Sequence, residues 1–192
     1  FFHTRDLKRY VLRLLLLALL SEIPFDLMYA GTSFFPFHQN VIWTFLIALF
    51  CMWVIERVKR RGNLWLTLLA AAGVSLAGWL AGTIAMVDYY GAGVLTVLLF
   101  YLFRGGLWWQ RLGQAAGMIW INCGLLAGLV LQVNILGLTV EFPQQGFALL
   151  ALIPIWLYRG RQGYHSRWVQ TACYLFYPVH ILVLAMMVRF LL

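Results

Sequence analysis

Charged residues are scarce in this sequence. Of its 192 residues, only 10% are Asp, Glu, Lys or Arg, whereas 64% are apolar. Average soluble proteins have about 25% charged and roughly 45–50% apolar residues, and a soluble fold of this size could not bury so much apolar surface. The composition therefore excludes soluble, secreted and disordered proteins. A membrane β-barrel is excluded as well, because the apolar runs are continuous rather than alternating.

The motifs of several enzyme and metal-binding classes are also missing. The sequence contains no Walker loop, no HExxH and no GxSxG, which excludes P-loop ATPases, zinc proteases of that type and hydrolases with a nucleophile elbow. Cysteine is rare, and Cys51, Cys123 and Cys173 lie within apolar runs without CxxC or Cys/His ligand spacing. Because such thiols behave as small apolar side chains, we expect three free cysteines and no metal site.

Seven apolar segments make up most of the chain. They cover residues 7–20, 40–55, 64–87, 93–103, 114–138, 147–158 and 168–192, each bound being approximate. A spanning helix needs ~20 residues, so the first, fourth and sixth segments are short, and Pro24 is expected to end or kink the first helix. We predict an all-α fold: a polytopic transmembrane helix bundle of six to eight helices, with a single domain over residues 1–192.

The basic residues lie in short clusters between these segments. With the residue 1 end in the cytoplasm and the segments alternating in direction, thirteen of the fourteen basic residues are cytoplasmic, and only Arg189 is not. The thirteen are Arg5, Lys8, Arg9, Arg13, Arg57, Lys59, Arg60, Arg61, Arg104, Arg111, Arg159, Arg161 and Arg167. This asymmetry predicts a multi-pass membrane protein in that orientation. The same placement indicates that the net charge of +8 does not serve to bind nucleic acid.

Three places carry more polarity than helix association requires. The first is a basic stripe near the start of the chain, where Arg5, Arg9 and Arg13 recur every four residues, with Lys8 beside them. Such a stripe is either an anchor for lipid phosphates or a site for a multiply phosphorylated donor, because guanidinium groups bind phosphates in a bidentate manner.

The second place is a group of polar residues expected at the opposite membrane face. It comprises Glu22, Asp26, His38, Asn40 and Asp88. Carboxylates at a membrane boundary act as general bases, bind a substrate amine, or are simply hydrated. The third place is in the last segment, where His180 lies twelve residues after Trp168, about 18 Å along a helix and near the membrane centre. Tyr177 precedes it on the same face, and Pro178 frees a backbone carbonyl between them.

These residues belong to motifs that resemble the TraX family of conjugative transfer systems. The matching motifs are His3-Thr4-Arg5-Asp6-Leu7-Lys8-Arg9-Tyr10, Ser21-Glu22-Ile23-Pro24-Phe25-Asp26-Leu27, Gln39-Asn40-Val41, Asp88-Tyr89-x-Gly91-x-Gly93-Val94-Leu95, the run 147–152 and Tyr174-x-Phe176-Tyr177-Pro178-x-His180. The family is named for acetylation of the N-terminus of the pilin subunit and resembles wider membrane acyltransferases. Because this chain starts without Met, and related proteins have one or two helices before the His3 motif, we expect it to lack them.

The resemblance implies a location in the bacterial inner membrane, a function and a set of roles. The expected reaction transfers an acetyl group from cytoplasmic acetyl-CoA to the N-terminal amine of a pilin-like protein, or to another acceptor. By the resemblance, His180, Tyr177, Asp26 and Glu22 are catalytic, and the acceptor is bound by Asn40, Asp88 and Tyr89. The donor is bound by His3, Arg5, Lys8, Arg9 and Arg13. The alternatives are a non-enzymatic membrane scaffold for a pilin-like helix and, third, a transporter.

Overall fold

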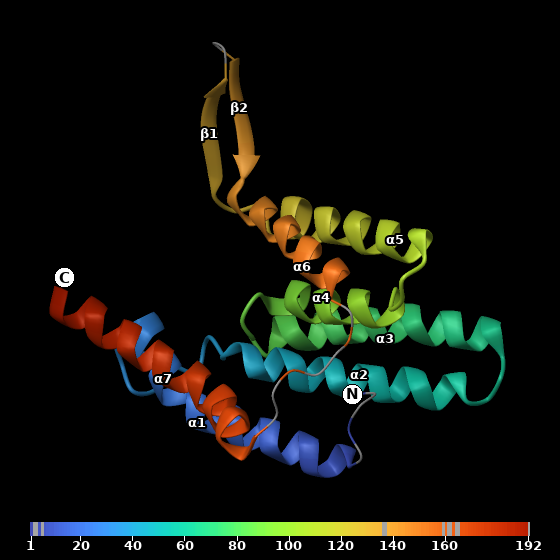
Figure 1. Cartoon of the computed structure of the whole chain (residues 1–192), viewed down its shortest axis with the longest axis horizontal. Coiled ribbons are helices and arrows are strands. Elements are labelled where there is room, and N and C mark those ends of the chain that lie inside the picture. Colours follow the sequence, from blue (N-terminus) through green and yellow to red (C-terminus); the bar gives the residue numbers. More distant parts are fainter. Residues whose placement is uncertain are drawn as a thin grey trace. The chain divides into compact units, whose positions relative to one another are not determined.

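The structure is a computed structural model that describes residues 1, 4, 6–135, 138–158, 160, 163 and 166–191. Its helices are α1 (Leu7–Ala30), α2 (Val41–Lys59), α3 (Leu64–Ile84), α4 (Tyr90–Leu102), α5 (Trp108–Ile119), the π-helix η1 (Trp120–Leu125), the 3-10 helix η2 (Gln144–Ala151), α6 (Leu152–Leu157) and α7 (Arg167–Leu191). Two strands, β1 (Val130–Ile135) and β2 (Leu138–Pro143), form an antiparallel hairpin. The helical fold class is confirmed (Figure 1).

Three helices of the described residues are long and apolar enough to cross a membrane. They are Val41–Lys59, Leu64–Ile84 and Trp168–Phe190. Two further apolar stretches, Tyr90–Leu102 and Gln144–Leu157, are shorter. Helix α1 has 24 residues, but its charged side chains distinguish it from these spans. The apolar helices identify the chain as a membrane protein.

Helix α1 corrects one of the two outcomes expected at Pro24, because the helix does not end there. The side chain of Asp6 caps its start by accepting the backbone N–H of Arg9, and the helix continues through Pro24 to Ala30. A proline removes one backbone donor, and α1 absorbs this loss within a long helix. The helix ends where Gly31 adopts a φ of 69°, a left-handed conformation that glycine reaches without strain.

The fifth apolar segment is also not the single helix expected over residues 114–138. Helix α5 ends at Ile119, η1 ends at Leu125, and the chain then forms the hairpin, in which Gln132 is opposite Glu141. Polar residues alternate with apolar ones along both strands, a period of two that favours extended chain over helix. The apolar content of this segment alone predicts a helix, whereas the alternation of polar and apolar residues predicts the hairpin.

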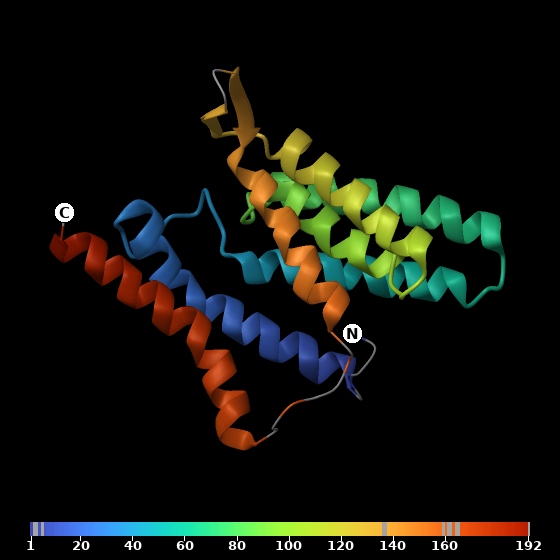
Figure 2. The same cartoon turned by 45° about the horizontal axis from the view of Figure 1, so that its top comes forward.

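The chain divides into two compact units, Phe1–Val94 with Gln162–Leu192, and Leu95–Arg161. In the first unit, α1 contacts both α7 and α2, and α2 contacts α3. Both views show α1 and α7 side by side and running in the same direction, with α2 running the opposite way (Figures 1 and 2). At the start of α4, a Cβ on Gly91 would lie 2.3 Å from the carbonyl oxygen of Trp79, so this close approach needs glycine.

The second unit holds its own polar contact. The indole N–H of Trp156 in α6 donates to Oε1 of Gln114 in α5 at 2.7 Å, and Nε2 of Gln114 donates to the carbonyl oxygen of Phe103. One amide side chain thus joins three segments of this unit. Across the two units, Cys51, Cys123 and Cys173 are free, as predicted.

Candidate functional site

The two ends of the first unit carry opposite charges because α1 and α2 are antiparallel. Lys8 and Arg9 at the start of α1 share one end with Arg57 near the end of α2, whereas Asp26 shares the other end with Asn40. We call these the basic end (Lys8, Arg9, Arg13, Arg57, Lys59 and Arg60) and the acidic end (Glu22, Asp26, His38, Asn40 and Asp88). With 24 residues in α1, at 1.5 Å per residue, roughly 36 Å separates its termini.

Glu22 is the carboxylate that the acidic end holds most firmly. Its Oε2 accepts the indole N–H of Trp43 at 3.0 Å and a short hydrogen bond from Nδ2 of Asn40. Its Oε1 is buried and has no hydrogen-bond partner among the described residues. One oxygen therefore fixes the carboxylate, while the other has no hydrogen bond among the described residues.

Asn40 is the junction between α1 and α2. It is fully buried, its Nδ2 also donates to the carbonyl oxygen of Ala18 at 2.9 Å, and its Oδ1 caps α2 by accepting the N–H of Ile42 at 3.0 Å. These contacts orient Glu22. The predicted role of Asn40 in binding the acceptor stays a prediction.

Asp88 is brought to the same end by a backbone bridge between two loops. Its N–H donates to the carbonyl oxygen of Gln39 at 2.8 Å, and its carbonyl oxygen accepts the hydroxyl of Thr44 at 3.0 Å. Its carboxylate lies 3.7 Å from Nε2 of His38. Burial raises the pKa of Asp88, and the neighbouring His38 opposes this rise. The next residue, Tyr89, has a φ of 60°, a strained value for a bulky residue.

His38 is enclosed by aromatic rings. Its ring stacks on Tyr29 at 4.4 Å and on Phe25 at 5.7 Å between centroids, with the edge of Tyr90 at 5.6 Å. Its Nδ1 is buried without a hydrogen-bond partner among the described residues. Asp26 is buried one turn from Glu22: its Oδ2 accepts the N–H of Phe35 at 2.8 Å, and its Oδ1 is likewise unpartnered there.

Helix α7 contributes Tyr177 to the acidic end. The Tyr177 hydroxyl lies near the backbone amide of Val41 at the start of α2. His180 is half-buried next to it, with the two rings edge to face at 5.7 Å. Its Nδ1 lies 2.9 Å from the carbonyl oxygen of Phe176. Since a carbonyl accepts, Nδ1 carries the proton and Nε2 is the unprotonated nitrogen of the neutral ring.

The basic end offers two pockets. One, of about 440 Å³, is lined by Thr4, Asp6, Arg9, Leu12 and Arg13. Nε of Arg9 pairs with Asp6 at 3.1 Å while the Arg9 side chain stays 85% exposed, so its guanidinium can still reach a ligand. His3 and Arg5, which the sequence places in the donor site, lie outside the described residues.

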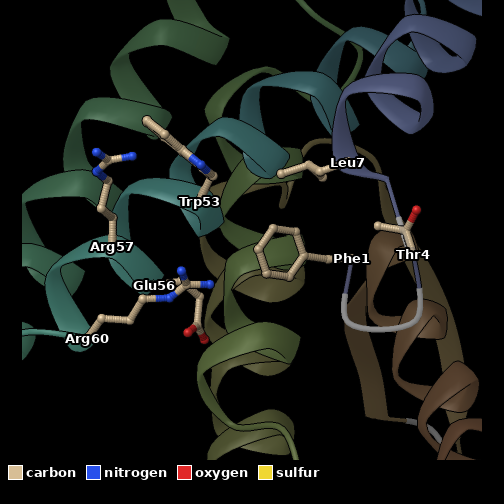
Figure 3. A pocket seen from close by; sticks show the side chains of 7 residues that line it. All are labelled: Phe1, Thr4, Leu7, Trp53, Glu56, Arg57 and Arg60. Carbon is tan, nitrogen blue, oxygen red and sulfur yellow. The ribbon is translucent and has the colours of Figure 1, made fainter.

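The second pocket of the basic end brings in residues that the site prediction missed. It has a volume of about 370 Å³ and is lined by Phe1, Thr4, Leu7, Trp53, Glu56, Arg57 and Arg60 (Figure 3). The guanidinium of Arg57 lies 5.3 Å from the centroid of the Trp53 ring. The spacing of Trp53, Arg57 and Arg60 places them on one helix face and could have predicted this pocket. The positive-inside pattern assigns the two arginines to membrane orientation alone.

Comparison with known proteins identifies a family for the chain. A family model described as TraX protein matches residues 1–188. No curated protein and no solved structure matches the chain. The match covers both ends of the first unit and all the candidate site residues.

Proposed function

The chain belongs to the TraX family, and from this premise we propose that it is an acyltransferase of the bacterial inner membrane. The proposed reaction transfers an acetyl group from cytoplasmic acetyl-CoA to the N-terminal amine of a pilin-like protein, or to another acceptor. The acceptor approaches the acidic end, and the donor is bound at the basic end. The acetyl donor is a substrate here, and the proposal needs no metal.

The arrangement of Glu22 is the observation that carries this proposal. A general base needs a defined position and an oxygen free to take a proton. Trp43 and Asn40 fix Oε2, and Oε1 has no partner among the described residues. Asp26, one turn further along α1, offers a second buried carboxylate oxygen.

In the proposed reaction, side chains of the acidic end take up or donate the protons. The acceptor nitrogen attacks the thioester carbonyl, so that an N–C bond forms, and Glu22 takes the proton released from nitrogen. The C–S bond then breaks, and the sulfur leaves as a thiolate. The Tyr177 hydroxyl is the proposed donor to the intermediate oxyanion, since fixed donors stabilise charge as it develops. His180 provides Nε2 as a further proton acceptor, and Asp88, Asn40 and Tyr89 bind the acceptor.

The donor site of this proposal uses Lys8, Arg9 and Arg13, with His3 and Arg5. Arginine forks match phosphate oxygens, and the pocket at Arg9 and Arg13 opens beside them. Nine residues separate Arg13 from Glu22, or roughly 14 Å along the helix axis. A donor held at Arg13 must therefore extend its thioester arm along α1 to reach the base.

Calorimetry on the full-length protein tests the donor site. Coenzyme A should bind the wild type, and Arg9→Ala and Arg13→Ala should each weaken binding by about 1.5–3 kcal/mol, the free energy of a charge-assisted hydrogen bond. Arg61→Ala is the matched control, because Arg61 is exposed just beyond α2 and lines neither pocket. Equal affinity of wild type and both variants would show that the donor site is elsewhere.

A non-enzymatic scaffold for a pilin-like helix is the second candidate. Helix α3 favours it, because only Gly78 and Gly82 are buried along its length, leaving an apolar surface on which another helix could pack. Small residues allow such close approach in lipid. A scaffold would bind no coenzyme A, so the same calorimetry separates the two functions.

A further inference from the structure

The pocket of Figure 3 combines two cations with an aromatic wall at the end of a membrane helix. Arg57 and Arg60 line one side, and Leu7 and Phe1 lie across from them. The carboxylate of Glu56, which also lines it, is paired with Lys59 at 3.8 Å, and this pairing offsets its charge. The pocket therefore suits a phosphate group lying against apolar atoms.

An apolar groove continues from this pocket between α1 and α2. It has a volume of about 550 Å³ and shares Leu7 and Trp53 with the pocket. Val11 and Leu15 of α1 and Leu46 of α2 line it further in, away from the helix ends. The groove is thus a path for a hydrocarbon chain whose polar end would lie between the arginines.

We propose that the pocket and the groove together bind one anionic phospholipid. Its phosphate pairs with Arg57 and Arg60, and one acyl chain lies between α1 and α2. Lys8, which lines the groove near its polar end, adds a third cation. Basic pockets between membrane helices bind anionic headgroups in this manner.

Two features favour a lipid over a soluble phosphate compound. The groove is formed by α2, a candidate membrane span, and by the α1 helix beside it, so lipid chains would surround its opening. Trp53 lies at the junction of groove and pocket, and tryptophan concentrates at the level of lipid headgroups. Arg57 and Arg60 take no part in the acyl transfer proposed above, although the lipid site shares Lys8 with its donor site.

Native mass spectrometry and thermal shift of the delipidated full-length protein test the site. The ligands are dioleoyl phosphatidylglycerol, dioleoyl phosphatidylcholine, short-chain dihexanoyl phosphatidylglycerol, inorganic phosphate and coenzyme A. We expect the long-chain phosphatidylglycerol to bind at least ten-fold tighter than phosphatidylcholine, the short-chain lipid and inorganic phosphate. Coenzyme A, the ligand of the proposed donor site, should not displace it. The double variant Arg57→Gln/Arg60→Gln should weaken it about thirty-fold and Arg60→Gln alone about five-fold, since each surface cation contributes ~1 kcal/mol to anionic lipid binding.

Matched variants separate this site from general attraction. Arg61→Gln/Arg111→Gln removes the same charge outside the pocket and should bind the lipid as wild type does. Val11→Phe fills the groove and should weaken long-chain binding alone, whereas Leu16→Phe, on an exposed part of α1, should not. Equal losses in both arginine pairs, equal binding of phosphatidylcholine, or competition by coenzyme A with no effect of Val11→Phe would each overturn the proposal.

Discussion

Trp43 donates its indole N–H to the carboxylate of Glu22 across the contact between α1 and α2, at 3.0 Å and over 21 residues of sequence. The bond joins a titratable group inside one helix to the first turns of the next. Asn40 completes the arrangement by donating to the same carboxylate oxygen. The candidate base is thus held by neutral donors rather than by a cation, which leaves it able to exchange a proton.

The first prediction concerns the charge of Glu22. Glu22→Gln keeps the shape and the acceptor oxygen for Trp43 and Asn40 but removes proton uptake, so acyl transfer should fall by ~10²-fold or more. Transfer from radiolabelled acetyl-CoA to an acceptor peptide with a free N-terminal amine measures it. Glu141→Gln, in the exposed hairpin, is the control. Unchanged transfer by Glu22→Gln would remove Glu22 from the reaction.

The second prediction concerns the stability provided by Asn40. Asn40→Ala removes the cap of α2 and the side-chain donor to both the carbonyl oxygen of Ala18 and the carboxylate of Glu22, which should lower the free energy of unfolding by about 2–4 kcal/mol. Asn63→Ala removes the exposed cap of α3 and should cost only about 1 kcal/mol. Denaturation in mild detergent compares them, and equal losses would contradict the junction role.

The third prediction concerns orientation in the membrane. The basic end should face the cytoplasm, because the positive charges of short loops remain on that side. Single cysteines placed at Arg61 and at Phe37, both exposed, are to be labelled in intact cells with a membrane-impermeant maleimide after replacement of the native cysteines. Phe37→Cys should react and Arg61→Cys should not; the reverse pattern would invert the topology.

The sequence predicted the long helices better than the contacts between them. Helices α2 and α7 follow the expected segments, because an uninterrupted apolar run of that length predicts a membrane-spanning helix. The charged end of α2 extends further, to Lys59, since Lys and Arg are good helix formers with favourable charge at a C-terminus. The hairpin was missed because apolar content was counted without its period.

The candidate site was predictable in part for a similar reason. Because successive helices alternate in direction, Glu22 and Asp88 can be assigned to the same end without knowledge of any contact. The structure brings them there together with His38. The bond from Trp43 depends on which faces of α1 and α2 meet, and the single sequence does not fix those faces. The pairing of Asp88 with His38 likewise depends on a loop-to-loop bridge.

The fourth prediction is a pH dependence of stability. Because burial raises the pKa of Asp88 above its ordinary value, which is about 3.9, the folded protein binds this proton more tightly than the unfolded chain does. The stabilisation is complete below the ordinary value and is lost as the pH rises through the higher folded value. As the pH rises through that window, the free energy of unfolding of the wild type should therefore fall relative to that of Asp88→Asn. Thermal unfolding at stepped pH measures it, and a constant difference would contradict the prediction.

The last prediction concerns His180. Its Nδ1 is engaged by the carbonyl oxygen of Phe176, and its ring contacts those of Phe176, stacked at 4.9 Å, and Tyr177, so Nε2 is the nitrogen left for chemistry. If Nε2 takes part, His180→Ala should lower acyl transfer by ~10²-fold or more, with coenzyme A affinity and thermal stability close to wild type.

A purely structural His180 would give the opposite pattern. His180→Ala would then lose thermal stability while the folded fraction kept its specific activity, because the bond to Phe176 and the ring contacts would be lost without any change at the reacting atoms. His180→Asn sharpens the comparison: its side-chain amide can still donate to the carbonyl oxygen of Phe176 but cannot act as a base near neutral pH. A stable His180→Asn variant without activity assigns Nε2 to the reaction, and a stable His180→Asn variant with wild-type activity removes it.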